Sequence, residues 1–94
     1  MTIHVTQDNI DRSKVLLRNK VGSFLDKFAD PITLAIGETL KAKRCMTHPY
    51  TAEVDGAVFN LSDEAIRWSK EWCQGIIGQP FSFTLSYVSG KIAT

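Results

Sequence analysis

Hydrophobic and polar residues follow their clearest pattern between residues 51 and 72, where a β-hairpin leads directly into an amphipathic helix. Two strand-like runs, Thr51–Val54 and Ala57–Leu61, flank the dipeptide Asp55-Gly56. A two-residue type I′ turn needs positive φ at both central residues, which Asp tolerates and Gly adopts without steric cost. The pattern therefore predicts a hairpin with a two-residue loop and a fixed register.

The residues after this hairpin predict a capped helix. Ser62 is placed to accept hydrogen bonds from the first free N–H groups, and Asp63 and Glu64 suit the positive end of the helix dipole. One half of the helical wheel is apolar and holds Ala65, Ile66, Trp68, Trp72, Cys73, Ile76 and Ile77. We expect Cys73 to be a small buried side chain there. The helix should end at one of the two glycines before Pro80.

Two further elements are predicted in the first third of the chain. Ile3 and Val5 alternate with polar neighbours and indicate a short first strand. A helix follows, capped by Thr6 or Asp8, and it ends at the residue before Pro31, because proline drives that residue out of the α region. The apolar stripe of this helix is Ile10, Leu17, Val21, Phe24, Leu25 and Phe28.

The stretch from Pro31 to Met46 fits two interpretations. Strand-like alternation occurs at Ile32, Leu34, Ile36, Leu40, Ala42, Arg44 and Met46. This alternation predicts two strands around the Gly37-Glu38 break, and we favour it. The rival interpretation is a helix with Asp30 as its N-cap and Pro31 at its first position.

The last predicted strand runs from Phe81 to Val88. One face carries Phe81, Phe83, Leu85 and Tyr87, and the other carries Ser82, Thr84 and Ser86. Because no charge or proline lies within it, an exposed edge on this strand would invite pairing with another chain. We therefore expect it to lie centrally in the sheet, with residues 40–46 forming an edge protected by lysines.

Together these elements predict an α+β fold, a mostly antiparallel sheet of about five to six short strands with two amphipathic helices packed on one face. The chain has 94 residues, 44% hydrophobic and 22% charged, which is typical of one globular domain spanning residues 1–94. No apolar run approaches the ~20 residues that span a bilayer. The first residues do not resemble a secretory signal, so we expect a cytoplasmic location and two free thiols.

The sequence carries no catalytic or phosphate-binding motif: Gly-x-Ser-x-Gly, Walker and Gly-x-Gly-x-x-Gly patterns are all missing. Cys45 and His48 have C-x-x-H spacing, and His4 and Cys73 lie elsewhere in the chain. A structural zinc site usually needs two close ligand pairs, and only one is present. We therefore expect no enzymatic activity, no cofactor and no metal.

Trp68 is the first candidate for binding a partner. It falls at the margin of the apolar arc of its helix, beside Glu64 and Glu71, and Arg67 and Glu71 are candidates together with it. A tryptophan at such a boundary can close the core or anchor a partner protein, and we expect it to be more exposed than Trp72.

A second candidate set is basic and aromatic and comprises Lys41, Lys43, Arg44, His48 and Tyr50. On a strand, Lys41 and Lys43 would share a face and Arg44 would oppose them. With the two ring side chains nearby, such residues could contact a phosphate backbone and stack a base. Lysines on an edge strand also serve simply to keep it soluble. The formal net charge of +1 gives no general attraction to nucleic acid.

These observations favour a non-enzymatic protein-interaction domain, a small accessory, regulatory or inhibitory protein that acts by binding a larger protein. A phage or other mobile-element origin is compatible with its size. One alternative is a small nucleic-acid-binding protein that uses the basic strand and loop. Another is a structural subunit of a larger assembly. A homodimer is left open, and no membrane partner is expected.

Overall fold

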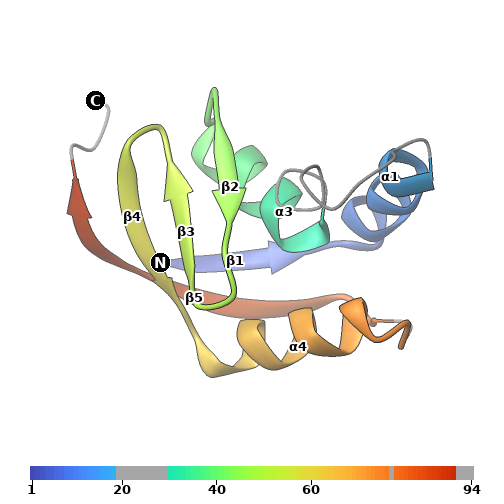
Figure 1. Cartoon of the computed structure of the whole chain (residues 1–94). Helices are drawn as coiled ribbons and strands as arrows, with labels where there is room; N and C mark the ends of the chain where they lie inside the picture. Colours follow the sequence, from blue (N-terminus) through green and yellow to red (C-terminus); the bar gives the residue numbers. More distant parts are fainter. Residues whose placement is uncertain (19–29, 77, 91–94) are drawn as a thin grey trace.

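The chain folds into a curled antiparallel sheet with three helices, as a computed structural model describes it for residues 1–18, 30–76 and 78–90 (Figure 1). In chain order the elements are β1 (Thr2–Val5), α1 (Gln7–Arg18), α3 (Pro31–Leu40), β2 (Cys45–Thr47), β3 (Thr51–Val54), β4 (Ala57–Leu61), α4 (Asp63–Cys73) and β5 (Phe81–Gly90). The predicted α+β class, with a mostly antiparallel sheet, is confirmed.

Helix α1 begins at the cap that the sequence predicts. Thr6 Oγ1 accepts from the Asn9 N–H at 3.1 Å, and Asn9 Oδ1 accepts from the Thr6 N–H at 2.9 Å. This reciprocal pair satisfies N–H groups that the start of a helix leaves free. The helix is described up to Arg18, and its predicted continuation to Phe28 lies outside the described residues.

The strand predicted around Ile32 is wrong, because Pro31–Leu40 forms α3 instead. Asp30 is the N-cap, and its Oδ1 accepts from the Thr33 N–H at 2.8 Å. Proline fits the first helical position, where no N–H is needed and its fixed φ suits the helix. The buried apolar side chains after the proline follow helical rather than strand spacing: Ile32, Ala35 and Ile36.

The second predicted strand is shorter than expected, because α3 reaches Leu40. Lys41 is the C-cap of α3, with a φ of 50° in the left-handed region, and β2 begins only at Cys45. Lys41 and Lys43 therefore precede the strand and do not share one of its faces. The prediction of an edge formed by residues 40–46 is wrong in that respect, although β2 itself is an edge strand.

The predicted hairpin is confirmed. β3 and β4 pair up to Val54 and Ala57, which leaves Asp55 and Gly56 as the two-residue loop. Their φ angles are 47° and 90°, the positive pair that a type I′ turn requires.

Helix α4 starts after Ser62, as predicted, but the serine side chain is used differently. Ser62 has the backbone conformation of an N-cap, whereas its hydroxyl accepts from the Thr84 N–H at 3.4 Å and so contacts β5. Ala65 is fully buried against the core. The prediction that Cys73 is buried is wrong, because the last turn of α4 lines a surface groove and leaves this thiol exposed.

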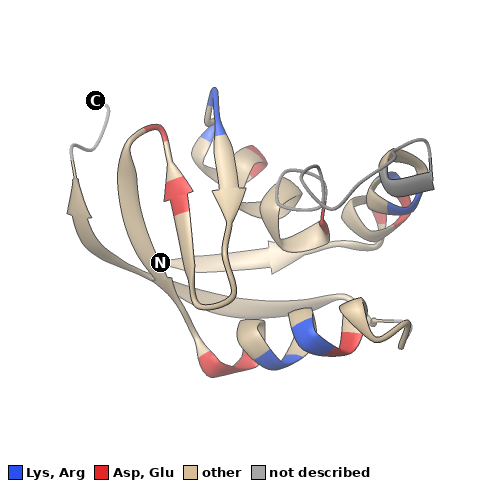
Figure 2. Cartoon of the chain, in the orientation of Figure 1, with Lys and Arg blue, Asp and Glu red and all other residues tan. Residues whose placement is uncertain are grey.

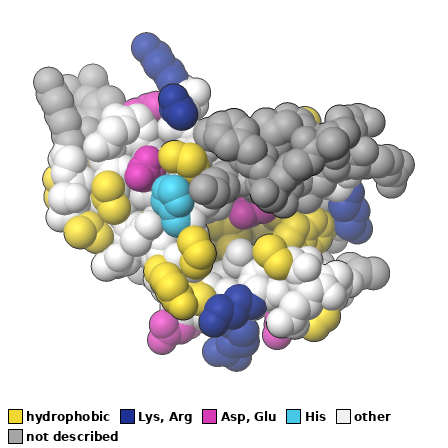
Figure 3. Space-filling view, in the orientation of Figure 1, with side chains coloured by type: hydrophobic (Ala, Val, Ile, Leu, Met, Phe, Trp, Pro, Cys, Tyr) yellow, Lys and Arg dark blue, Asp and Glu magenta, His cyan; other side chains and the backbone are white. Residues whose placement is uncertain are grey.

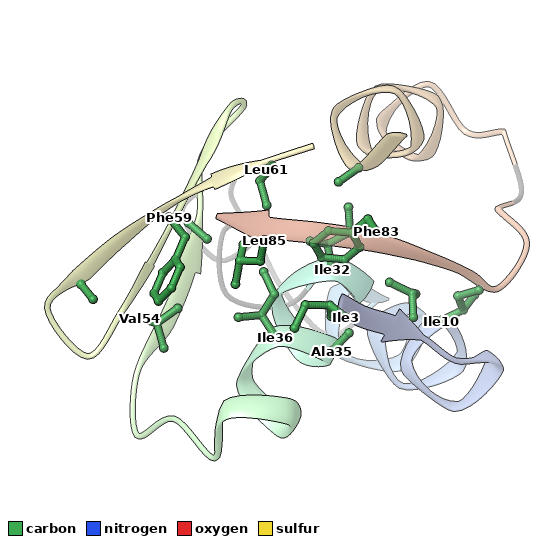
Figure 4. Close-up of a cluster of buried hydrophobic side chains, with 14 residues drawn as sticks. Ile3, Ile10, Ile32, Ala35, Ile36, Val54, Phe59, Leu61, Phe83 and Leu85 are labelled. Carbon is green, nitrogen blue, oxygen red and sulfur yellow. The ribbon is translucent and has the colours of Figure 1, made fainter. Parts of the chain in front are cut away.

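The sheet has the strand order β1-β5-β4-β3-β2, so the central position predicted for β5 is confirmed for its first half, Phe81–Leu85, where β1 and β4 or the residues next to them lie on either side. One hydrophobic cluster fills the space between the inner face of the sheet and the helices. Figure 4 shows Phe83 and Leu85 of β5 lying toward Ile32 and Ile36 of α3. The opposite face of β5 carries the predicted exposed hydroxyls, Ser82, Thr84 and Ser86.

Candidate functional site

Strand β5 pairs with a different neighbour along each half, and this arrangement leaves part of one edge open. β1 covers one edge of Phe81–Thr84, and β4 covers the other edge of Leu85–Gly90. The contact with β1 ends at Met1, whose backbone N and O bond to the O and N of Leu85 at 3.2 and 2.8 Å. Beyond this point, none of the described residues pairs with the edge of β5 that faces away from β4.

Tyr87 presents backbone hydrogen-bonding groups at this open edge. In an antiparallel strand, the N–H and C=O groups of alternate residues point to the same side. Because Leu85 bonds to Met1, the corresponding groups of Tyr87 point toward the open side. The side chains of Tyr87 and Val88 are 50% and 49% exposed. An edge of this kind is one to which another strand can add.

A hollow of about 350 Å³ opens beside this edge on the inner face of the sheet. Most of its wall is apolar and comes from Met1, Leu40, Val54, Phe59, Leu85 and Tyr87. The rings of Phe59 and Tyr87 meet edge to face, with their centroids 5.8 Å apart. Figure 4 shows Val54, Phe59 and Leu85 projecting into the same space. The open edge and this hollow together are called the β5 site below.

The pairing of β4 with β5 is irregular at the end of β5, beside this hollow. Gly90 pairs with Ala57 and has a φ of 95°, and a Cβ at Gly90 would lie 2.4 Å from the Gly56 carbonyl oxygen. Only glycine allows the two strands to come this close here. One extra residue of β5, Val88, forms a bulge, which increases the local twist. The Tyr87 hydroxyl spans this bulge and donates to the Gly90 carbonyl at 2.5 Å.

Trp68 is packed within a stack of rings. Its ring lies nearly parallel to Trp72 and to Phe81, at centroid distances of 5.5 and 5.1 Å. Its Nε1 donates to the Gln79 carbonyl at 2.9 Å. Both tryptophans are half-buried, and Trp68 is the middle ring of the stack. The geometry therefore gives Trp68 a structural task, which is to hold α4 against the start of β5.

The basic residues predicted to bind a partner lie together in the loop between α3 and β2 (Figure 2): Lys41, Lys43 and Arg44. The Asp55 carboxylate accepts from the backbone N–H of Lys43 at 3.1 Å and of Arg44 at 2.8 Å. The loop is thereby tied to the hairpin turn. His48 and Tyr50 follow the other end of β2, so this strand separates the basic residues from the rings expected to stack a base.

Arg67 and Glu71 are exposed on the outer side of α4. The residues predicted to bind a partner therefore lie on three separate parts of the surface: α4, the basic loop and the β2–β3 turn. The structure does not bring them together into one site.

A second groove, of about 420 Å³, lies between the β2–β3 turn and α4. Hydrophobic side chains are visible in the hollow above α4 in Figure 3. His48 and Cys73 both line this groove. His48 Nε2 lies 3.5 Å from Glu53 Oε1, and Tyr50 beside it is 61% exposed.

Two side chains have shifted pKa values, and burial is the main cause of both shifts. Burial raises the pKa of Asp30, although hydrogen bonds from Thr33 and Thr47 oppose this shift. Burial, with a smaller contribution from the charges of Asp30 and Asp55, raises the pKa of Cys45 to about 12. Both shifts favour the uncharged side chain, which suits positions at the edge of the core.

Within residues 1–18, 30–76 and 78–90, no three His, Cys, Asp or Glu side chains are grouped so that they could hold a metal ion. The same ranges contain no helix that is long and apolar enough to cross a membrane.

Sequence reasoning missed the residues that form the β5 site: Met1, Leu40, Phe59, Tyr87 and Val88. The signal already used to predict a covered strand points to this site, because β5 carries no charged residue along its length (Figure 2). Such a strand lacks the usual protection of an edge. Which half of the strand lacks a neighbour depends on where β1 ends, and no pattern within β5 reports that.

Comparison of the chain with models of protein families, with curated proteins and with solved structures finds no match. Function is therefore inferred from the surface itself. The β5 site combines backbone groups available for pairing with an apolar hollow.

Proposed function

We propose that this protein is a non-enzymatic protein-binding domain, a small accessory, regulatory or inhibitory protein that docks a partner at the β5 site. The observation that carries this proposal is the combination of an open strand edge at Tyr87 with an apolar hollow beside it. A partner there would cover Met1, Tyr87 and Val88, which are 58%, 50% and 49% exposed. Burial of apolar side chains is the main source of affinity in such contacts.

The uncharged character of β5 supports the same function. Proteins usually protect an open strand edge with lysine, proline or a covering segment. Phe81–Gly90 contains neither a charge nor a proline. The lack of charge along this edge is what we expect of a strand that a partner covers.

The shifted titratable groups fit a binding protein rather than an enzyme. Asp30 serves as the N-cap of α3, and the high pKa of Cys45 keeps its thiol protonated near neutral pH. A nucleophilic cysteine needs the opposite shift. Neither Cys45 nor Cys73 forms a disulfide, which agrees with action in a reducing, cytoplasmic environment.

Affinity capture from extracts of the native host, followed by mass spectrometry, tests this proposal with two matched variants. Val88→Lys places a charge on the open edge, and Val15→Lys makes the same change on α1, where Val15 is 56% exposed. Wild type and Val15→Lys should capture one common partner, and Val88→Lys should capture about tenfold less of it. Equal capture by all three proteins would show that the β5 site is not the docking surface.

A further inference from the structure

We propose that the β5 site accepts an extended segment of a different protein, which adds to β5 as a strand and places one apolar side chain in the hollow. This inference rests on the proposed protein-binding function and narrows the class of partner.

The backbone of β5 defines where such a segment lies. β1 occupies the edge as far as Leu85, so an added strand begins at Ser86 and continues in line with β1. Every strand pair in the sheet is antiparallel, and an antiparallel partner residue can exchange two hydrogen bonds with Tyr87. The edge from Ser86 to Gly90, which no described residue outside β4 pairs with, has room for a segment of about five residues, or ~17 Å of strand.

The hollow defines the side chain that faces Tyr87. Residues directly opposite each other on paired strands project from the same face of the sheet. Tyr87 projects to the inner face, where its ring contacts Phe59 and lines the hollow. The partner residue opposite Tyr87 therefore projects into the same hollow. Because the wall is mostly apolar, a leucine, isoleucine, methionine or phenylalanine fits there, and a charged side chain would lose its hydration.

The bulge in β5 argues against a second copy of this chain as the occupant. Phe59 pairs with Tyr87, whereas the preceding Val58 pairs with Ser89. Val88 is thus an extra residue between an inner-facing Tyr87 and an outer-facing Ser89. A bulge changes the alternation of side chains along one strand only.

The two-fold pairings of two β5 strands that are centred on Val88 or on Tyr87 each meet an obstacle. A pairing centred on Val88 would oppose Tyr87 of one copy to Ser89 of the other, an inner residue against an outer one. A pairing centred on Tyr87 would extend only to Leu85, whose backbone is already bonded to Met1. A partner strand without a bulge of its own has neither restriction.

The test begins with a displayed library of random peptides of about twelve residues, selected on the immobilised full chain. An enriched peptide is then synthesised with single N-methyl groups at successive positions. Because only alternate N–H groups of an added strand face β5, N-methylation should weaken binding about tenfold at every second position and have little effect between them. In the isotope-labelled protein, the amide of Tyr87 should become protected from exchange when this peptide binds.

A pair of protein variants tests the hollow separately. Leu40→Trp fills part of the hollow, and Leu16→Trp makes the same change on α1, where Leu16 is 39% exposed. Leu40→Trp should weaken peptide binding about tenfold, and Leu16→Trp should leave it unchanged. Thermal melts of both variants establish that they are folded.

Several results would overturn this inference and leave the proposed function standing, provided that Val88→Lys still loses the captured partner. They are uniform tolerance of N-methylation, perturbed amides confined to other parts of the surface, or no enriched peptide at all. Sedimentation that shows a concentration-dependent dimer, with Tyr87 protected in it, would identify a second copy as the occupant and also overturn the inference. If the captured partner is insensitive to Val88→Lys, the proposed docking surface itself fails.

Discussion

A single carboxylate joins the start of α3 to β2. Asp30 Oδ1 accepts from the Thr33 N–H at 2.8 Å, and its Oδ2 accepts from the Thr47 hydroxyl at 3.0 Å. Burial nevertheless raises the pKa of Asp30 above its ordinary value of 3.8. Near that pH the native state keeps a proton that the unfolded chain loses. The contribution of this bound proton to the free energy of unfolding is fully present below pH 3.8. It is lost as the pH rises through the pKa of Asp30 in the folded state.

Two substitutions at Asp30 distinguish the contribution of helix capping to stability from the effect of ionising the carboxyl group. Asp30→Asn keeps a capping oxygen but does not ionise, and Asp30→Ala removes the cap. In urea unfolding, wild type should lose stability relative to Asp30→Asn as the pH rises from about 4 to about 7. Asp30→Ala should be less stable than Asp30→Asn by about 1 kcal/mol or more at either pH. A constant difference between wild type and Asp30→Asn would contradict the raised pKa.

The two thiols should differ strongly in reactivity. Cys45 is half-buried with a pKa of about 12, whereas Cys73 is exposed. At about pH 8, a thiol with so high a pKa is ionised on the order of 10³ times less than a free cysteine. The folded variant Cys73→Ser keeps only the Cys45 thiol, and the folded variant Cys45→Ser keeps only the Cys73 thiol. With a disulfide reagent, the first variant should therefore react far more slowly than the second. Both variants should react at similar rates in concentrated urea, which provides the control.

The hairpin and the start of α4 could be predicted from local signals, whereas the favoured strand interpretation of Pro31–Leu40 is wrong and the rival helix, with Asp30 as N-cap and Pro31 at its first position, is what forms. The hairpin turn and the start of α4 depend on neighbouring residues such as Asp55, Gly56 and Ser62. In α3, Ile32 and Ile36 are four positions apart and share a face in either a helix or a strand. The half-exposed Leu34 and the buried Ala35 distinguish the two, but burial is not visible in a sequence.

The contact between α4 and the loop before β5 makes a prediction about Gly78. A Cβ at Gly78 would lie 2.3 Å from Cζ2 of Trp68, so the indole ring must shift out of its stack. Gly78→Ala should therefore lower the free energy of unfolding by about 1–3 kcal/mol. In a Trp68→Leu background, Gly78→Ala should lower the free energy of unfolding by much less, because the indole ring that the new methyl group meets is missing.

Gly37→Ala is the matched control for this prediction. Gly37 lies in α3, and a Cβ there would be 3.7 Å from the Cys45 Cβ, which is an ordinary contact. Alanine favours a helix over glycine by about 1 kcal/mol, so this variant should be as stable as wild type or more so. Equal costs at both glycines would show that the ring contact is not the cause.

At the scale of the whole molecule, the β5 site depends on contacts between distant parts of the chain. The sequence predicts that β5 is central, and this holds for the half of β5 that β1 covers. It does not predict that β1 stops at Leu85, or that a bulge at Val88 shifts the register between β4 and β5. These features depend on relative strand lengths and curvature, which arise only when the strands assemble.

Amide hydrogen exchange should reveal the two halves of β5 in the isolated protein. Phe83 and Tyr87 lie on the same edge of the strand, but Phe83 is opposite Ile3 and Tyr87 has no described partner on that side. The Phe83 amide should exchange more slowly than that of Tyr87 by about 100-fold or more. Comparable protection in a dilute monomer would show that the edge at Tyr87 is already covered.

The pairing of β1 with β5 also has a consequence for synthesis on the ribosome. Met1 and Leu85 bond across 84 positions of sequence, so β1 leaves the ribosome long before its partner strand exists. At ~5–20 residues per second, that interval is about 4–17 s. Joining the ends of so long a loop also carries an entropic cost. Until then Ile3 and Val5 have no strand beside them, so a chain truncated before Phe81 should be prone to aggregation.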